Sequence, residues 1–381
     1  MPVEQILTNA RIVTAEQEFV GTLVLRDGLI AQVEEGVSGL PQAQNLNGDY
    51  LLPGLVELHT DNLEKYMSPR PGVDWPSASA VLTHDAQIAS AGITTVFDAL
   101  AIGDVNPRGK RMQQLPAMLE AIAEASAAGH MRADHRLHLR CEVCHPETLA
   151  VFRDLVEHPL VQLVSVMDHA PGQRQFAKED KYREYYMGKY HLSEAEMDAF
   201  IVEQVGNSRQ YSDRQRRSIV ADCQARGISV ASHDDATLAH VQESASFGMS
   251  IAEFPTTLEA AKASHELGLK VLMGAPNIVR GGSHSGNIAA AELAQQGVLD
   301  ILSSDYYPAS LLQAALLLAG QDNGYDLPRA IATVSRVPAQ AAGLHDRGEI
   351  RVGLRADLVQ AQVHAGQAVI QQVWRQAKRV F

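Results

Sequence analysis

Cysteine, aromatic residues and positive charge are all scarce in this chain of 381 residues. Three cysteines are too few for the disulfide framework of a small secreted domain. Aromatic residues make up 5% of the sequence, and 45 acidic residues outnumber 32 basic ones, which gives a formal net charge of −13. Because nucleic-acid binding requires a basic surface, this balance argues against a nucleic-acid partner. It also disfavours a polyanionic substrate at first sight, since the mean field repels anions.

Long hydrophobic runs are also missing. The first residues, MPVEQILTNARIVTAEQEF, have no basic segment followed by a long apolar one, so we expect no secretory signal. The apolar segment between Asp305 and Asp322 contains Pro308 and is shorter than the roughly 20 residues that a membrane span needs. Together with the sparse cysteines Cys141, Cys144 and Cys223, these absences predict a cytoplasmic protein that has no membrane partner.

The middle of the chain, by contrast, alternates regularly between apolar strands and helical segments. The strand-like runs are LLPGLVEL, ITTVFDAL, RLHLRCEV, VQLVSVMD, ISVASH, SIAEFP, LKVLMGAP and DILSSD. Helical patterns such as LPAMLEAIAEASAAG lie between most of them, and this alternation implies parallel strands joined by crossovers. We therefore predict an α/β fold with a (β/α)8 TIM-like barrel over residues 51–344. A doubly wound sheet is the competing architecture, but it usually has fewer strands.

Both ends of the chain are rich in short strands and turns. Residues 1–50 and 345–381 carry β-branched runs broken by Asp-Gly and Pro. Because chain termini tend to lie close together, we expect one small β-sandwich domain made from both ends. The charged, Tyr-rich segment near 176–217 contains Ser193-x-x-Glu196 and Ser212-x-x-Gln215, which have the spacing of a helix capping box. This segment is predicted to be a helical insertion, a lid on the barrel.

Imidazole and carboxylate groups follow the strands directly, at the ends where barrels of this kind place their catalytic groups. These groups are His59-Thr60-Asp61, Arg140-Cys141-Glu142, Asp168-His169, His233-Asp234-Asp235, Glu253 and Asp305. Residues i and i+2 of a strand point the same way, so His59 and Asp61 can hold one ion together. A single histidine is more often a core residue than a ligand. Recurrence at successive strand ends, however, favours a site for zinc, manganese or iron.

Two further motifs have weaker chemical meanings. Cys141 to His145 has the CxxCH spacing of covalent haem attachment, but it overlaps an apolar strand, and buried inert thiols are the favoured interpretation. Gly281 to Gly286 has the outline of a phosphate loop without its Lys-Ser/Thr pair. Consecutive backbone N–H groups can still hold a phosphate, and a plain Gly/Ser turn is an equal alternative.

Basic residues gather in three loops at the same strand ends. Lys65 and Arg70 follow the first strand, and Arg280 precedes the Gly281 loop. The loop after His169 adds Arg174, Lys178, Lys181 and Arg183. Charged loop residues are usually solvated and contribute little. If these loops converge on one barrel mouth, they form a local positive funnel in an acidic protein.

The strings PGLVELHTDNLEK, AGITTVFDAL, GGSHSGN, SSDYYP and GEIRVGLRADLV together resemble the amidohydrolase superfamily over essentially the whole chain. They are most similar to the members that act in the carbon–phosphorus lyase pathway of phosphonate catabolism. The resemblance implies a metal-dependent barrel with a small β-sandwich. The implied reaction is hydrolysis of a ribose 5-triphosphate that carries methylphosphonate at C1, which yields the 5-phosphate and pyrophosphate.

The sequence departs from the usual pattern of this superfamily at three strand ends. Asp61 replaces the second His of the first strand, and Glu253 stands where a His is common. The fourth strand ends without a lysine, so Glu142 is expected to be the bridging carboxylate in place of a carbamylated lysine. This oxygen-rich set makes a simple amide hydrolase less favoured and suits manganese or magnesium as well as zinc.

From this resemblance we expect one or two divalent ions, with zinc first and manganese or magnesium as alternatives. The expected metal ligands are His59, Asp61, Glu142, His169, His233 and Asp305. Asp305 is also the expected catalytic base for the attacking water. The expected substrate-binding residues are Lys65, Arg70, Arg280, Gly282, His284 and Asn287.

The implied partner is a small ribosyl phosphonate triphosphate. A homodimer is the base-rate expectation, since symmetric dimers are the commonest assemblies. The alternative functions are a cyclic-amide or N-acyl hydrolase of the same superfamily and a non-catalytic barrel scaffold.

Overall fold

The computed structural model describes residues 4–105, 109–174, 179–283, 286–320 and 324–381, without the side chain of Lys181. The chain folds into two compact units. The first unit contains Met1–Asp98, Ala121–Arg136 and Met273–Phe381, and the second contains Ala99–Glu120 and Leu137–Leu272. Expected site residues that lie outside the described ones are His284 and, among the basic loop residues, Lys178.

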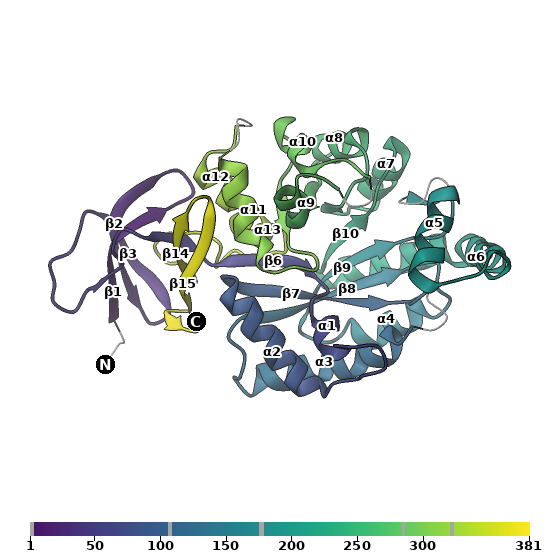
Figure 1. The fold of residues 1–381 in the computed structure, drawn as a ribbon, viewed down its shortest axis with the longest axis horizontal. Helices are drawn as coiled ribbons and strands as arrows, with labels where there is room; N and C mark the ends of the chain where they lie inside the picture. The colour runs from purple at the N-terminus through teal and green to yellow at the C-terminus, as the bar shows by residue number, and fades with distance from the viewer. Residues whose placement is uncertain (1–3, 106–108, 175–178, 284–285, 321–323) are drawn as a thin grey trace. The chain divides into compact units, whose positions relative to one another are not determined.

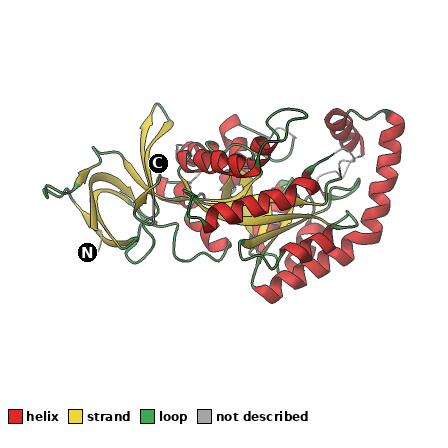
Figure 2. Cartoon of the chain, turned by 90° about the horizontal axis from the view of Figure 1, so that it is seen from below, coloured by secondary structure: helices red, strands yellow, loops and turns green. Residues whose placement is uncertain are grey.

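The first unit contains a mixed sheet made from both ends of the chain. Its strands are β1 (Glu4–Val13), β2 (Glu18–Arg26), β3 (Leu29–Glu35), β4 (Gln44–Asn45), β5 (Tyr50–Pro53), β14 (Leu358–His364), β15 (Gln367–Arg375) and β16 (Lys378–Arg379). Their order is β16-β15-β14-β5-β1-β2-β3, with β4 beside β1. Figures 1 and 2 show these N-terminal and C-terminal strands side by side. The expected sheet from both termini is therefore confirmed, while its domain boundaries stay a prediction.

Local sequence signals explain the hairpins and the core of this sheet. Asp27 and Gly28, with φ of 52° and 84°, form the two-residue turn between β2 and β3, as Asp-Gly does in tight hairpins. The inward-facing residues of the strands, such as Leu23 and Leu25 on β2, are fully buried. Trp374 of β15 is 2% exposed and packs in the same core.

The second sheet is parallel and contains all eight expected strands, which follow one another in sequence order. They are β6 (Leu55–Thr60), β7 (Ile93–Ile102), β8 (Asp134–Glu142), β9 (Val161–Met167), β10 (Ser229–His233), β11 (Ile251–Glu253), β12 (Lys270–Gly274) and β13 (Ile301–Ser303). Strands β6 and β7 are buried along their whole length, as parallel strands covered on both faces are. A bridge between Thr60 and Asp305 joins the first strand to the segment after the last one. The expected (β/α)8 barrel is confirmed.

Helices follow most of these strands. The first unit contains α1 (Leu63–Met67), α2 (Ser77–Ser90), α9 (Ala275–Arg280), α10 (Ala290–Gln295), α11 (Ser310–Ala319), α12 (Leu327–Ala332) and α13 (Arg336–Ala341). The second unit contains α4 (Thr148–Leu155), α5 (Glu179–Tyr190), α6 (Glu194–Arg226), α7 (Leu238–Ser246) and α8 (Leu258–Glu266). Helix α3 (Arg111–Ala127) has residues in both units. Among the helices that the structure describes, none combines the length and apolar character needed to cross a bilayer.

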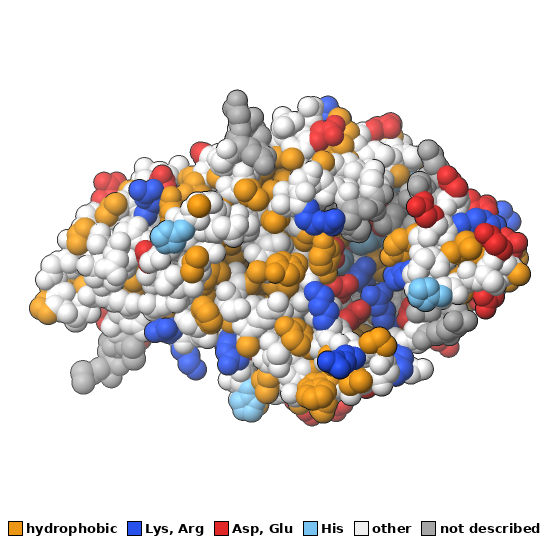
Figure 3. Space-filling model, in the orientation of Figure 1, with side chains coloured by type: hydrophobic (Ala, Val, Ile, Leu, Met, Phe, Trp, Pro, Cys, Tyr) orange, Lys and Arg blue, Asp and Glu red, His pale blue; other side chains and the backbone are white. Residues whose placement is uncertain are grey.

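The segment expected to be a helical insertion consists of α5 and α6 in its described part. The capping box at Ser193 is confirmed, because its Oγ accepts from the N–H of Glu196 and the Glu196 carboxylate accepts from the Ser193 N–H. The second expected cap is wrong, since Ser212 lies buried in the middle of α6, where its Oγ donates to Ser208 Oγ at 3.3 Å. Figure 3 shows acidic and basic side chains interspersed at the end of the molecule where α5 and α6 lie. One ion pair of these helices joins Arg183 to Asp198.

Candidate active site

In the second unit, the ends of β8 and β9 bring Glu142 and His169 together. The N–H of His169 donates to Glu142 Oε1 at 3.0 Å, and its ring Nδ1 lies 2.5 Å from Glu142 Oε2. Glu142 is 3% exposed. Burial raises the pKa of its carboxyl, but the charge and hydrogen bonds of His169 lower that pKa by a larger amount. The net shift of the Glu142 pKa is therefore downward. The two effects have the opposite signs for His169. Burial lowers its pKa, but Glu142 and Asp234 together raise it to about 10.

The next two strand ends extend this cluster. His169 Nε2 and His233 Nε2 lie 3.4 and 3.5 Å from the same atom, Asp234 Oδ2. On its other side His233 Nδ1 lies 3.1 Å from Glu253 Oε2, and Glu253 Oε1 lies 3.8 Å from His138 Nε2. Asp234 has a φ of 56°, the left-handed region where strained residues concentrate at functional sites. The structure therefore brings Glu142, His169 and His233 into one line of alternating imidazoles and carboxylates.

The donor chemistry of this cluster fits a divalent metal. Ligand atoms of His169, His233 and Asp234 lie within 4.8 Å of one another. Two imidazoles and a carboxylate are a set that zinc, manganese and iron all accept. His233 and Asp234 are each 5% exposed, and the side chain of His169 is 17% exposed. The cluster is therefore largely shielded from solvent, with most of its access at His169.

Arginines behind this cluster are buried in ion pairs. Arg174, expected to face the barrel mouth, is 3% exposed and pairs with Asp235 and Glu243. Arg216 of α6 lies 3.3 Å from the same Glu243 and 3.8 Å from Asp168. The expectation for Arg174 is therefore wrong: these guanidiniums neutralise the buried carboxylates of Asp168 and Asp235, which would otherwise be costly to bury, and they share the partly exposed Glu243.

In the first unit, the end of β6 and the segment after β13 bring His59, Asp61 and Asp305 together through their backbones. The N–H of Asp305 donates to the His59 carbonyl at 3.1 Å, and the Asp61 N–H donates to the Asp305 carbonyl at 3.1 Å. The same carbonyl accepts from Thr60 Oγ1 at 2.6 Å. Asp305 also has a left-handed φ, 55°. Three backbone and side-chain bonds thus hold this conformation at a candidate catalytic residue.

A buried carboxylate, Glu57, reinforces this junction. Its Oε1 accepts from the His59 N–H at 2.7 Å and from Ser303 Oγ at 2.5 Å, and its Oε2 accepts from the Ser304 N–H at 2.6 Å. Glu57 is fully buried, and burial raises its pKa despite these donors. Because it joins β6 to β13, Glu57 fixes the backbone that carries His59 and Asp305.

The expected anion-binding residues lie on separate elements of the first unit. Lys65 is exposed on α1. Arg70 is exposed in a turn, in which the Arg70 carbonyl accepts from the Val73 N–H at 3.0 Å. Arg280 is the last residue of α9, and Asn287 N–H donates to Ser283 Oγ at 3.3 Å. The N–H of Gly282 donates to the Asn277 carbonyl at 2.8 Å, so this group caps the C-terminus of α9 in this structure.

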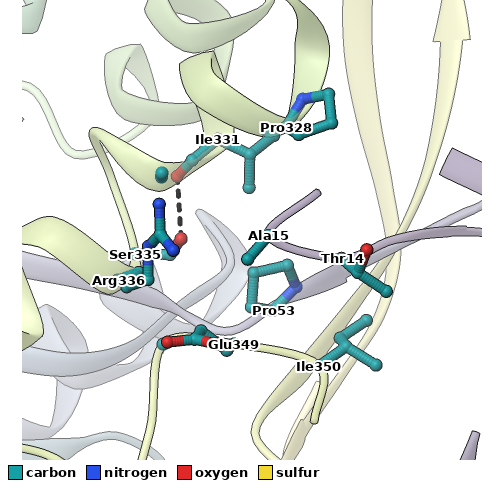
Figure 4. Close-up of a pocket in the computed structure, with 11 residues that line it drawn as sticks. Thr14, Ala15, Pro53, Pro328, Ile331, Ser335, Arg336, Glu349 and Ile350 are labelled. Atoms are coloured by element: carbon teal, nitrogen blue, oxygen red, sulfur yellow. Dashed lines mark hydrogen bonds between the residues drawn. The ribbon is translucent and has the colours of Figure 1, made fainter. Parts of the chain in front are cut away.

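A small pocket also lies in the first unit. Figure 4 shows its lining, which includes Pro53, Ile331 and Ile350, with Ser335 Oγ donating to the Ile331 carbonyl at 2.8 Å. Arg336 and Glu349 are the charged residues of this lining, which contributes no His, Cys or Asp. The pocket therefore lacks the ligand chemistry of the strand-end clusters.

The sequence prediction missed Glu57 and His138, while it named Asp234 and Glu253 at strand ends without giving them a role. A signal was present for the two missed residues, because Glu57 lies two residues before His59 and His138 lies four before Glu142, on the same faces of their strands. The three cysteines are buried and free of disulfides, which agrees with the interpretation of Cys141 and Cys144 as buried thiols.

Comparison with known proteins gives consistent results. Residues 86–365 match the model of the amidohydrolase family. The chain is 55% identical over 377 residues to the alpha-D-ribose 1-methylphosphonate 5-triphosphate diphosphatase of Escherichia coli strain K12, covering 99% of this chain and all of that protein. Among solved structures, a 5-methylcytosine deaminase from Klebsiella pneumoniae matches with a TM-score of 0.65 at 16% identity, covering 99% of this chain and 97% of that one. An ochratoxinase from A. niger matches with a TM-score of 0.66 at 14% identity, covering 100% and 96%. At these identities the two structures support the fold alone.

Proposed function

This chain belongs to the amidohydrolase family, and we propose that it hydrolyses alpha-D-ribose 1-methylphosphonate 5-triphosphate to the 5-phosphate and pyrophosphate. The observation that carries the proposal is the 55% identity to the Escherichia coli diphosphatase over the full length of that protein. Similarity that spans both chains end to end includes the strand ends and loops that bear the chemistry. The enzyme is a hydrolase of phosphonate catabolism that acts on a phosphoric anhydride.

The metal ligands that we propose are those expected from the sequence, together with Asp234. In the second unit these are Glu142, His169, His233 and Asp234, and the convergence of both imidazoles on Asp234 supports them. In the first unit we propose His59, Asp61 and Asp305, supported by the backbone bonds that hold the three together. A bound divalent ion, zinc in first place, supplies Lewis-acid polarisation and neutralises charge on the phosphoryl oxygens. One or two such ions satisfy this donor set.

The chain's own residues then perform three tasks. Asp305 accepts a proton from the attacking water, since a carboxylate is a suitable general base when it lies within hydrogen-bond reach. Lys65 and Arg70 bind the anionic oxygens, and Arg280, Gly282, His284 and Asn287 bind the other charged end. Positioning and charge neutralisation supply most of the rate, because phosphoryl transfer leaves little covalent work for protein groups.

The net charge of −13 is compatible with this anionic substrate. Acidic side chains that surround divalent cations no longer repel anions, since the ions dominate the local field. We further propose that the enzyme works in the cytoplasm, where its three buried thiols stay reduced, and that it forms a homodimer.

The decisive experiment follows the products by phosphorus NMR. Metal-loaded protein is incubated with the 5-triphosphate, and we expect pyrophosphate and the 5-phosphate in equal amounts. Chelator-treated protein should lose the activity and regain it on addition of zinc or manganese. Release of orthophosphate alone would contradict the proposed cleavage site. Hydrolysis of dihydroorotate-type amides in place of the triphosphate would favour an amide hydrolase.

A further inference from the structure

A second polar cluster, separate from the proposed ligands, is buried in the first unit. Asp98 of β7 lies between two histidines, with Oδ1 2.7 Å from His84 Nε2 and Oδ2 2.7 Å from His135 Nδ1. His135 Nε2 lies 3.3 Å from Asp85 Oδ1, and Asp85 Oδ2 lies 3.0 Å from Arg132 Nη1. His84, Asp85, Asp98 and His135 are at most 2% exposed. Burying such a network of charged groups costs free energy, so it is worth asking what the network does in the protein.

The cluster has the residue types of a metal site, but its hydrogen bonding is already closed. Both ring nitrogens of His135 face carboxylate oxygens, so the ring is an imidazolium. Burial lowers the pKa of His135, but Asp98 and Asp85 raise it to about 9. His84 donates from Nε2 to Asp98, which leaves Nδ1 as an acceptor. A cluster in which both ring nitrogens of each histidine already have a hydrogen-bond partner is complete without an ion.

The second ring nitrogen of His84, Nδ1, connects the cluster to Asn62. The Nδ2 group of Asn62 donates both of its hydrogens, to His84 Nδ1 at 3.0 Å and to Gln87 Oε1 at 2.7 Å. Its orientation is therefore fixed, and its Oδ1 faces the other way, where it accepts from Lys65 Nζ at 3.2 Å. Lys65 Nζ also donates to the carbonyl of Tyr306. A chain of oriented bonds thus runs from the buried carboxylate of Asp98 to an exposed ammonium group.

Helix α1, which carries Lys65, cannot hold this geometry alone. It has five residues, its N-cap Asn62 makes no side-chain cap bond, and helices this short are unstable in isolation. A lysine side chain also has much rotamer freedom to lose when it is fixed on a ligand. An acceptor that holds the ammonium in advance removes part of that cost.

We propose that Asn62 is a positioning residue, fixed by His84 and Gln87, that holds the Lys65 ammonium in place for the anionic substrate. The inference rests on the proposed function only in that Lys65 meets the substrate. Asn62 acts through Lys65 and does not itself touch the reacting atoms. Asp98 and His135 act one step further back, because they fix the ring of His84.

The test is a double-mutant cycle that combines Asn62→Leu with Lys65→Met. Alone, Asn62→Leu should raise KM about tenfold with kcat little changed, the effect of losing one hydrogen bond to a charged group. In the Lys65→Met background the same change should have no further effect on KM. Equal increases in both backgrounds would show a general structural role and overturn the proposal. Thr83→Ala on the exposed face of α2, which removes only a bond to the Ser79 carbonyl, is the matched control and should leave KM unchanged.

A second measurement does not depend on the substrate. Competitive acetylation followed by mass spectrometry compares the reactivity of Lys65 in the wild type and in Asn62→Leu, and we expect a rise of about tenfold on loss of the Asn62 acceptor. Should Asn62→Leu fail to fold, Gln87→Leu, which removes one of the two acceptors that orient Asn62, should raise the reactivity in the same direction. Unchanged reactivity overturns the positioning role. Raised reactivity in a protein that does not cleave the triphosphate supports the positioning role and refutes only the proposed function.

Discussion

His169 is bound to Glu142 by both its backbone and its ring: its N–H donates to one carboxylate oxygen at 3.0 Å, and its Nδ1 lies 2.5 Å from the other. This double contact fixes the ring so that Nε2 faces Asp234. Glu142, which we also propose as a metal ligand, thus contacts His169 through both of its oxygens. Carboxylates that orient a metal-binding imidazole in this way raise its basicity and set its direction.

Replacing Glu142 with Gln should therefore weaken metal binding. A glutamine keeps one acceptor oxygen, but it presents an NH2 group where the other oxygen received a donor. We expect metal affinity to fall about 10- to 100-fold, the usual effect of losing an orienting partner, as measured by competition with a chromogenic chelator. Glu147→Gln, on an exposed residue in the turn that follows, is the control. Unchanged affinity would mean that Glu142 does not support the metal site.

Asp305→Asn should lower kcat and leave substrate binding nearly intact. An amide cannot accept the proton of the attacking water, and general-base catalysis contributes about 10²- to 10⁴-fold. The backbone bonds of Asp305 to His59 and Asp61 do not depend on its carboxylate. Steady-state kinetics and metal content should be measured on the same sample. If the variant lost metal in parallel with kcat, the fall in kcat would come from the role of Asp305 as a metal ligand and not from its role as a base.

Glu57→Gln should destabilise the protein. Each carboxylate oxygen of Glu57 accepts from a backbone N–H, that of His59 or that of Ser304, so an amide NH2 would face a donor in either orientation in a fully buried place. We expect the free energy of unfolding to fall by about 1–3 kcal/mol, the cost of a buried unsatisfied group. Urea unfolding checks the value, and Glu266→Gln on the exposed end of α8 should change it little. A neutral result at Glu57 would indicate that it is protonated in the folded protein.

Gly103→Ala should disturb the position of Glu142. A Cβ atom at Gly103 would lie 2.5 Å from Thr148 Oγ1 and 3.0 Å from Glu142 Cβ, and the φ of Gly103 is 90°. We expect a loss of about 1–3 kcal/mol in the free energy of unfolding, with weaker metal binding. Gly129→Ala is the matched control, because Gly129 also has positive φ, 69°, but has open space around it. If the free energy of unfolding fell equally in both variants, the loss would come from backbone strain alone and not from a contact with Glu142.

His135 should make the stability depend on pH in the alkaline range. Its pKa is raised to about 9 in the folded protein, against about 6.5 in an unfolded chain. Between these values the folded protein holds a proton that the unfolded chain has lost. The stabilisation is thus complete below pH 6.5 and is lost as the pH rises through 9. The gap in unfolding free energy between wild type and His135→Gln should narrow over this range in urea titrations. Groups that do not contact this network titrate equally in both proteins, so a constant gap would contradict the charged state of His135.

The sequence determined the barrel, the sheet shared by the two chain ends, and which strand ends carry imidazole and carboxylate groups. These features depend on local signals: apolar runs of strand length, Asp-Gly turns, and polar residues directly after a strand. Ser193 shows how far such signals reach, because its capping partner lies three residues away and was predicted correctly. Ser212 has the same spacing, but it lies within a helix that continues past it.

Tertiary structure alone decided which groups meet. Glu142 and His169 are 27 residues apart, and Glu57 and Ser303 are 246 apart. No periodicity encodes such a pair, because it depends on which strands become neighbours and in which register. The buried network of His84, Asp98 and His135 was invisible for the same reason: each residue alone resembles an ordinary polar residue on a helix or strand. Only packing, which removes water from all of them at once, forces them to satisfy one another.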